Sequence, residues 1–125
     1  MKRILPITLA AVWIVISEFF RNEFVFKRYW IDHFAWLGLE FKTLPVNGIL
    51  WIIWSVALAF VIFKLLTKFS FRETVLLSWL VAFVMMWLTM YNLQVLPLML
   101  LLFAVPLSLI EVLVAAWIIE KVWGR

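Results

Sequence analysis

Apolar residues fill long stretches of this chain, and polar residues are confined to short breaks between them. From Thr74 to Ile110 there is no Asp, Glu, Lys, Arg or His. A helix needs about 20 predominantly apolar residues to cross the hydrocarbon core of a bilayer, so this stretch is long enough for more than one crossing. The pattern therefore predicts a protein that resides in a membrane.

Breaks in the pattern divide the chain into four predicted transmembrane helices, over residues 4–20, 44–63, 74–91 and 95–119. The last two have to form a hairpin, because one helix from 74 to 119 would be about 70 Å long at ~1.5 Å per residue, whereas the hydrocarbon core is about 30 Å thick. Asn92 and Gln94 mark the expected turn. The sequence predicts an all-α integral membrane protein, a four-helix bundle that forms one domain over residues 1–125.

Between the first and second spans, apolar residues recur at helical spacing among charged ones. Glu23 and Lys27 are opposite charges four residues apart, a spacing that stabilises helices. The apolar positions are Phe26, Trp30, Phe34, Leu37 and Phe41. This pattern predicts an amphipathic helix over residues 24–37 that lies in the outer interface of the membrane. In the alternative, the same residues extend the first helix beyond the bilayer until Gly38 ends it.

Composition excludes several classes of protein. The chain is 68% hydrophobic and 14% charged, whereas soluble domains are roughly 25% charged. It has no cysteine, which excludes disulfides and thiol redox centres. The Lys and Arg residues form no clustered basic stripe, so nucleic-acid binding is not expected. No sequence motif indicates a cofactor or a metal site.

The distribution of Lys and Arg predicts an orientation, because cytoplasmic loops are enriched in these residues. On one side of the predicted bundle lie Lys2, Arg3, Lys64, Lys68, Arg72, Lys121 and Arg125; on the other lie Arg21, Lys27, Arg28 and Lys42. Both termini are therefore expected in the cytoplasm, in a bacterial-type inner (plasma) membrane, with dual topology as the alternative. Five tryptophans are expected to anchor helices at the membrane interface: Trp30, Trp51, Trp54, Trp117 and Trp123.

Two carboxylates fall within predicted spans. Glu111 lies about 12 Å from the cytoplasmic end of the fourth span at ~1.5 Å per residue, a depth at which an unpaired charge is costly. It is expected to face the bundle and to have no basic partner, because no predicted span contains Lys or Arg. Glu18 lies near the outer end of the first span and is interpreted as the partner of Arg21 in an interfacial ion pair. Because the two acids differ in predicted depth by about 9 Å, they are not expected to form a direct acid/base pair, and the transport alternative makes them separate stations on a proton path.

Weakly polar residues accompany these acids. Ser108 lies on the same helix face as Glu111, together with Ala104 and Ala115. Thr89 belongs to a polar seam on the third span that is suited to face either acid. The candidate intramembrane proton site therefore comprises Glu111, Glu18, Ser108 and Thr89. In the structural alternative, Glu111 is a buried carboxyl that holds helices together, and the seam only packs.

Three functional classes remain open from the sequence. The scarcity of polar residues in the spans favours a non-enzymatic accessory component of a membrane complex. Glu111 and Glu18 favour a small proton-coupled transporter or channel. Asp32 and His33 are the weak catalytic candidates for a lipid-modifying enzyme. The expected partners are the lipid bilayer and either a second copy of the chain or a larger membrane complex. A deep cavity that reaches Glu111 would favour transport, a groove at His33 an enzyme, and a dry core the accessory role.

Overall fold

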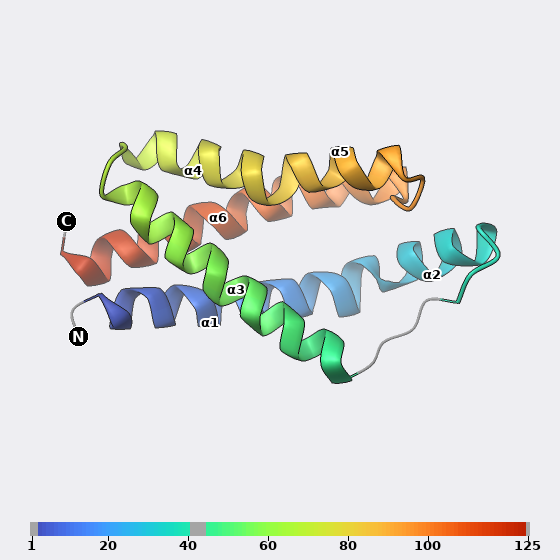
Figure 1. The fold of residues 1–125 in the computed structure, drawn as a ribbon, viewed down its shortest axis with the longest axis horizontal. Coiled ribbons are helices and arrows are strands. Elements are labelled where there is room, and N and C mark those ends of the chain that lie inside the picture. The colour runs from blue at the N-terminus through green and yellow to red at the C-terminus, as the bar shows by residue number, and fades with distance from the viewer. Residues whose placement is uncertain (1–2, 41–44, 125) are drawn as a thin grey trace.

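The computed structural model describes residues 3–40 and 45–124, and in these ranges it consists of helices joined by short turns, without a strand. Four long helices run over Ile4–Trp36, Pro45–Leu66, Phe71–Asn92 and Leu98–Trp123 (Figure 1). Each is long and apolar enough to cross a membrane. The prediction of an all-helical chain with four such helices is confirmed.

The first long helix consists of three segments, α1 (Ile4–Phe20), the π-helix η1 (Arg21–Phe26) and α2 (Lys27–Trp36). It does not break at Phe20, where the first predicted span ends, because Arg21 keeps helical backbone angles. It ends at Trp36, and Gly38 follows in the left-handed conformation, with a φ of 77° that suits glycine. Residues 24–36 are thus helical and continuous with α1, an arrangement that matches the alternative of an extended first helix. The position of α2 in the interface stays a prediction.

The second and third long helices meet at a capped turn and diverge from it. Helix α3 covers Pro45–Leu66, and the third long helix comprises α4 (Phe71–Trp79), the π-helix η2 (Leu80–Val84) and α5 (Met85–Asn92). The Ser70 hydroxyl accepts a hydrogen bond from the Glu73 amide at 3.2 Å, a cap that starts α4 earlier than predicted. The buried residues of α3 all lie from Ser55 onward. Its N-terminal half leans away from α5 (Figure 1).

The chain reverses after α5, at the predicted turn. The Val95 amide donates to the Met90 carbonyl at 3.0 Å, and Gln94 has a left-handed φ of 63°. A short 3-10 helix, η3 (Leu98–Leu100), leads into α6 (Leu101–Trp123). The N-terminal end of α1 and the C-terminal end of α6 lie at the same end of the molecule (Figure 1).

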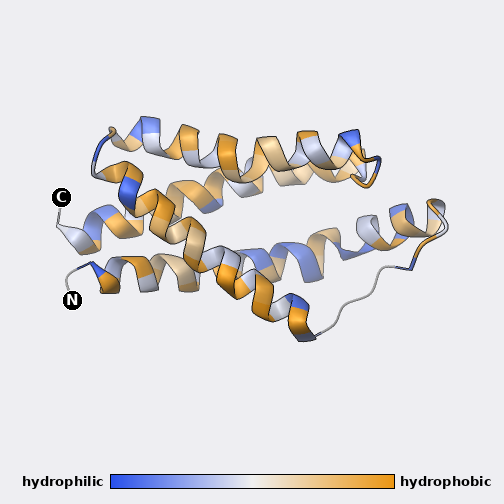
Figure 2. Ribbon diagram, in the orientation of Figure 1, coloured by the Kyte–Doolittle hydropathy of each residue, from blue (hydrophilic) through white to orange (hydrophobic). Residues whose placement is uncertain are grey.

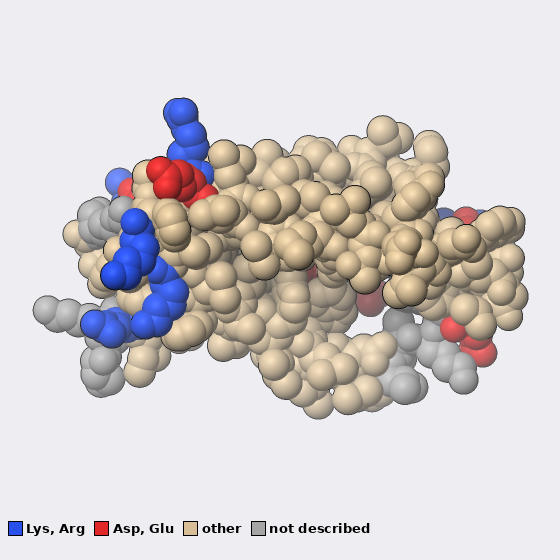
Figure 3. All heavy atoms as spheres, turned by 45° about the horizontal axis from the view of Figure 1, so that its top comes forward, with Lys and Arg blue, Asp and Glu red and all other residues tan. Residues whose placement is uncertain are grey.

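Helix α1 packs against both α3 and α6, and small residues let the three backbones approach closely. These are Ala10, Ala11, Ala59, Ala115 and Ala116, all of them buried. Apolar residues occupy most positions of the helices (Figure 2), and many large apolar side chains are exposed on their outer faces. On the face shown in Figure 3, the charged side chains gather at the two ends, and acidic atoms are recessed in a hollow between them. The fold thus combines an apolar exterior with charges inside.

Candidate functional site

Three charged side chains meet inside the bundle. Arg21 and Glu18 form an ion pair one helical turn apart, and Arg21 Nη2 lies 3.7 Å from Oε1 of Glu111. The exposed fractions are 6% for Arg21, 3% for Glu18 and 0% for Glu111. One guanidinium is therefore shared by two carboxylates, one from α1 and one from α6, and we call these three residues the buried triad.

The two carboxylates of the buried triad are held differently. Glu18 also accepts a hydrogen bond from Nδ2 of Asn22, 3.1 Å from its Oε2, and the same amide reaches the Glu18 carbonyl at 3.0 Å. Neither carboxylate oxygen of Glu111 has a hydrogen-bond partner among the described residues, and the same is true of Nη1 of Arg21. Glu18 is thus fixed, whereas Glu111 and one side of the guanidinium retain unused hydrogen-bonding capacity.

Both π-helical segments of the described chain meet at the buried triad. Arg21 is the first residue of η1, and its guanidinium carbon lies 5.0 Å from the centre of the Phe83 ring in η2. It lies 5.9 Å from the Phe26 ring. Such distances allow attraction between the cation and the ring faces. Because π-helical turns occur frequently at functional sites, this coincidence supports a functional role.

Helix α6 is held around Glu111 by two tryptophans. Nε1 of Trp13 donates to the Glu111 carbonyl at 2.9 Å, and Nε1 of Trp79 donates to the Ser108 hydroxyl at 2.9 Å. Pro106 lies within this helix and lacks the amide hydrogen that would continue the helical bonding there. The backbone that carries Glu111 is thus positioned by α1 and α4, next to an irregular point in α6.

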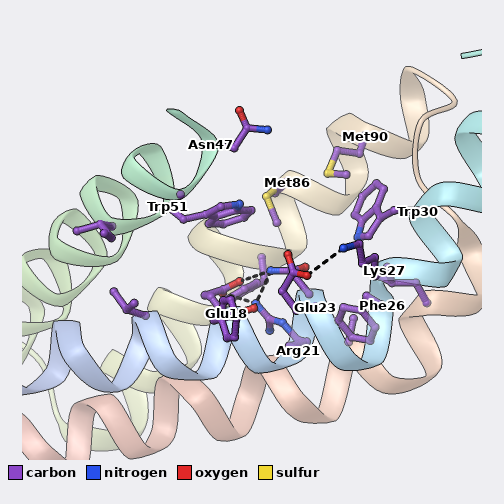
Figure 4. Close-up of a pocket in the computed structure, with 18 of the residues that line it drawn as sticks. Glu18, Arg21, Glu23, Phe26, Lys27, Trp30, Asn47, Trp51, Met86 and Met90 are labelled. Carbon is purple, nitrogen blue, oxygen red and sulfur yellow. Dashed lines mark hydrogen bonds and ion pairs between the residues drawn. The ribbon is translucent and has the colours of Figure 1, made fainter. Parts of the chain in front are cut away.

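A cavity of about 660 Å³ opens beside the buried triad. Its polar lining consists of Glu18, Arg21, Asn22, Glu23, Lys27 and Asn47. In Figure 4, Trp51 of α3 and Trp30 of α2 lie on opposite sides of it, with Glu18 and Arg21 at its floor. Glu111 does not line the cavity but contacts it through Arg21. We call this space the α3–α5 cavity, after the two helices that diverge around it.

A second cavity, of about 450 Å³, lies further along the same face of α3. Trp54 lines it, and the Trp54 ring packs edge-on against Phe83, which lines the α3–α5 cavity. Its polar lining includes Ser78, which is buried and whose hydroxyl has no hydrogen-bond partner among the described residues. The Trp54–Phe83 contact lies between the two cavities.

The structure changes two expectations about the acids. Glu111 has a basic partner, Arg21, although no predicted span contained one. The acids are also closer in depth than predicted, because α6 continues to Trp123. Glu18 lies about 21 Å along its helix from Ile4, and Glu111 lies about 18 Å along its helix from Trp123, at ~1.5 Å per residue. They are neighbours at one site rather than separate stations.

Ser108 and Thr89, the other two residues of the predicted proton site, differ in their distance from the buried triad. Ser108 is buried one turn from Glu111 and bonds to Trp79. Thr89 is exposed on α5, and its hydroxyl donates to the Met85 carbonyl of its own helix at 3.0 Å. Only Ser108 is therefore close to the buried triad.

Asp32 and His33 lie apart from the buried triad, near the end of α2. Asp32 is exposed and pairs with Arg28 at 3.3 Å. Nε2 of His33 lies 2.9 Å from the Gln94 carbonyl, which links α2 to the turn after α5. In the described part of the chain, no three His, Asp or Glu side chains are placed to share a metal ion. Neither residue lines either cavity.

The tryptophans predicted as interfacial anchors have varied surroundings. Trp30 and Trp51 line the α3–α5 cavity, and Trp54 packs on Phe83 inside the bundle. Trp123 packs on Phe63, with ring centres 4.8 Å apart, and Trp117 is 53% exposed. Four of the five thus have internal contacts that their sequence positions did not indicate, and Trp117 is the exposed exception.

Sequence reasoning paired Arg21 with Glu18 but placed the pair at the membrane interface, and it did not include Arg21 and Asn22 in a buried site with Glu111. Both follow Glu18 at helical spacing, three and four residues later, and this was the available signal. It was obscured because a cluster of charges after an apolar stretch is usually a loop at the membrane surface. No protein-family model, curated protein or solved structure matches the chain.

Proposed function

We propose that this chain is an integral membrane protein with four transmembrane helices and that it transports a small molecule in exchange for protons. The exposed apolar helix surfaces support the membrane location, because water would make such a surface unfavourable. The two acids that share Arg21, Glu18 and Glu111, and the cavity beside them support the coupling of transport to protons. The first long helix of 33 residues would be about 50 Å long at ~1.5 Å per residue, so we place α2 beyond the hydrocarbon core, in or above the outer interface.

The observation that carries this proposal is the sharing of one buried guanidinium by two buried carboxylates. With all three groups ionised, the buried triad has one negative charge in excess. An unpaired charge in a low-dielectric interior is strongly unfavourable, so the excess is neutralised by a proton or by another cation. A single exchangeable proton beside a ligand-sized cavity is the arrangement that proton coupling requires.

The geometry favours transport over the other two classes. A dry core was expected for an accessory protein, whereas the α3–α5 cavity reaches Glu18 and Arg21; it does not reach Glu111 itself, which contacts Arg21 at 3.7 Å. An enzyme that used Asp32 and His33 would need a cavity at those residues, and both described cavities are lined by other side chains. Transport also requires the cavity to face each side of the membrane in turn, for which the π-helical segments and Pro106 provide points of deformation.

The proposal is tested in everted membrane vesicles that contain the protein and whose interior is kept more acidic than the medium. Amphipathic cations, anions and neutral molecules are added in turn, and the gradient is followed with a pH-sensitive dye. Wild-type vesicles should lose the gradient with one of these classes, and Glu111→Gln should not, because the amide cannot exchange the proton. Glu73→Gln, an exposed acid outside the site, is the matched control and should behave as wild type. A gradient that no class dissipates would refute transport and restore the accessory role.

A further inference from the structure

We infer that the α3–α5 cavity binds an amphipathic organic cation and that binding releases one proton from the buried triad; the coupling rests on the proposed function. Three features of the cavity favour this ligand: its lining, its charge balance and the way Arg21 is shared by two carboxylates.

Aromatic side chains form a third of the lining. Seven rings contribute to it, from Phe19, Phe26, Trp30, Phe34, Trp51, Phe83 and Trp87. Ring faces attract cations, tryptophan most strongly, and they also accommodate an apolar body. The volume of about 660 Å³ lies within the usual range for drug-sized ligands, about 300–1,000 Å³. The lining therefore suits a bulky molecule with both apolar surface and positive charge.

The charges around the cavity favour a cation over an anion. Lys27 and Glu23 form an ion pair at 3.2 Å and cancel each other's charge. The net charge around the cavity is therefore that of the buried triad. Its two carboxylates and one guanidinium carry an excess negative charge that an anion would increase and a cation would cancel. Arg21 is already engaged by Glu18 and Glu111. Its Nη1 atom has no hydrogen-bond partner among the described residues, so an anion bound there is the competing arrangement.

Because Glu18 and Glu111 share Arg21, binding of a ligand at Glu18 can release a proton from Glu111. Before binding, Glu18 and Arg21 form an ion pair, and one proton on the Glu111 carboxyl balances the buried triad. A cation that reaches Glu18 from the cavity takes over as its partner, and Arg21 can then neutralise Glu111, which lies 3.7 Å away. The Glu111 proton leaves as the ligand enters. One monovalent cation replaces one proton, so the net charge does not change and no covalent bond is made or broken.

Two probes of the same shape and opposite charge test the ligand class. Tetraphenylphosphonium and tetraphenylborate are titrated separately into the purified full-length protein in a neutral detergent, and tryptophan fluorescence reports binding. We expect the phosphonium to bind and its affinity to rise about tenfold per pH unit, the slope for one released proton. The borate should bind at least tenfold more weakly at every pH. Equal or tighter binding of the borate, or phosphonium binding that does not depend on pH, would overturn the inference.

Variants separate this inference from general damage to the fold. Glu18→Gln should weaken phosphonium binding at least tenfold and abolish its pH dependence. If that variant does not fold, Glu111→Gln tests the same point from outside the cavity, because it too removes the excess charge and the exchangeable proton. Glu73→Gln should bind as wild type does. A protein that binds the phosphonium with proton release but does not dissipate the vesicle gradient would refute transport and leave the ligand class standing.

Discussion

At the scale of single residues, Arg21 decides how the interior of this protein is charged. Its guanidinium is the buried cation of a site with two acids, and it is held by Glu18 on its own helix and by Glu111 on α6. It also stacks on Phe83. A lysine could not make these contacts together, because its single ammonium lacks the planar, forked donors of arginine. Arg21 thus connects α1, α6 and η2 through one side chain.

We expect Arg21→Met to lower the free energy of unfolding by about 3 kcal/mol, because removal of one partner leaves buried carboxylates unpaired. The double variant Arg21→Met with Glu18→Gln should recover more than half of this loss. Arg28→Met is the matched control, since Arg28 pairs with Asp32 at the surface and its loss should cost less than about 0.5 kcal/mol. Chemical denaturation in detergent micelles measures all three. An Arg21→Met variant as stable as Arg28→Met would contradict the structural importance of the buried triad.

At the scale of elements, the sequence predicts which segments are helical better than it predicts how they continue. Four helices and the turn at Asn92–Gln94 follow from hydrophobicity and polar breaks alone, because those signals are local. The continuation of α1 into η1 and α2 was only an alternative interpretation. Charges such as Arg21 and Glu23 normally mark a membrane surface, and a π-helical turn shifts the 3.6-residue period on which helix patterns depend.

The candidate site shows the same division between local and non-local information. Glu18 and Glu111 were selected as unusual because a carboxylate among apolar residues is visible in the sequence. Their convergence on Arg21 was not visible, because it depends on how α1 and α6 pack and on where α6 ends. The α3–α5 cavity arises from the divergence of α3, which leaves its first ten residues without buried side chains. No sequence pattern indicated that angle.

At the scale of the whole molecule, the burial of Arg21 strengthens the charge asymmetry. With Arg21 removed from the outer loops, three Lys and Arg residues remain on that side, Lys27, Arg28 and Lys42, against the seven on the other. We therefore propose a single orientation with both termini in the cytoplasm. Placed this way, the α3–α5 cavity lies toward the outer side and the helix ends near Ile4 and Trp123 lie toward the inner side.

Single cysteines test this orientation cleanly, because the natural chain has none. A cysteine at Ser70, in the turn between α3 and α4, should react with an impermeant thiol reagent only after the cells are opened. A cysteine at Leu39, an exposed residue after α2, should react in intact cells. Labelling of both positions in intact cells would show dual topology, and the site would then have to work in an antiparallel pair.

The central claim is that the buried triad holds one exchangeable proton, and infrared difference spectroscopy tests it most directly. A protonated carboxyl has a carbonyl band that an ionised carboxylate lacks, and the spectrum is recorded before and after tetraphenylphosphonium is added to the purified protein. We predict that wild type loses one protonated-carboxyl band on binding, that Glu111→Gln lacks this band from the start, and that Glu73→Gln behaves as wild type. A wild-type spectrum without a protonated-carboxyl band, or a band that persists in Glu111→Gln, would contradict the account.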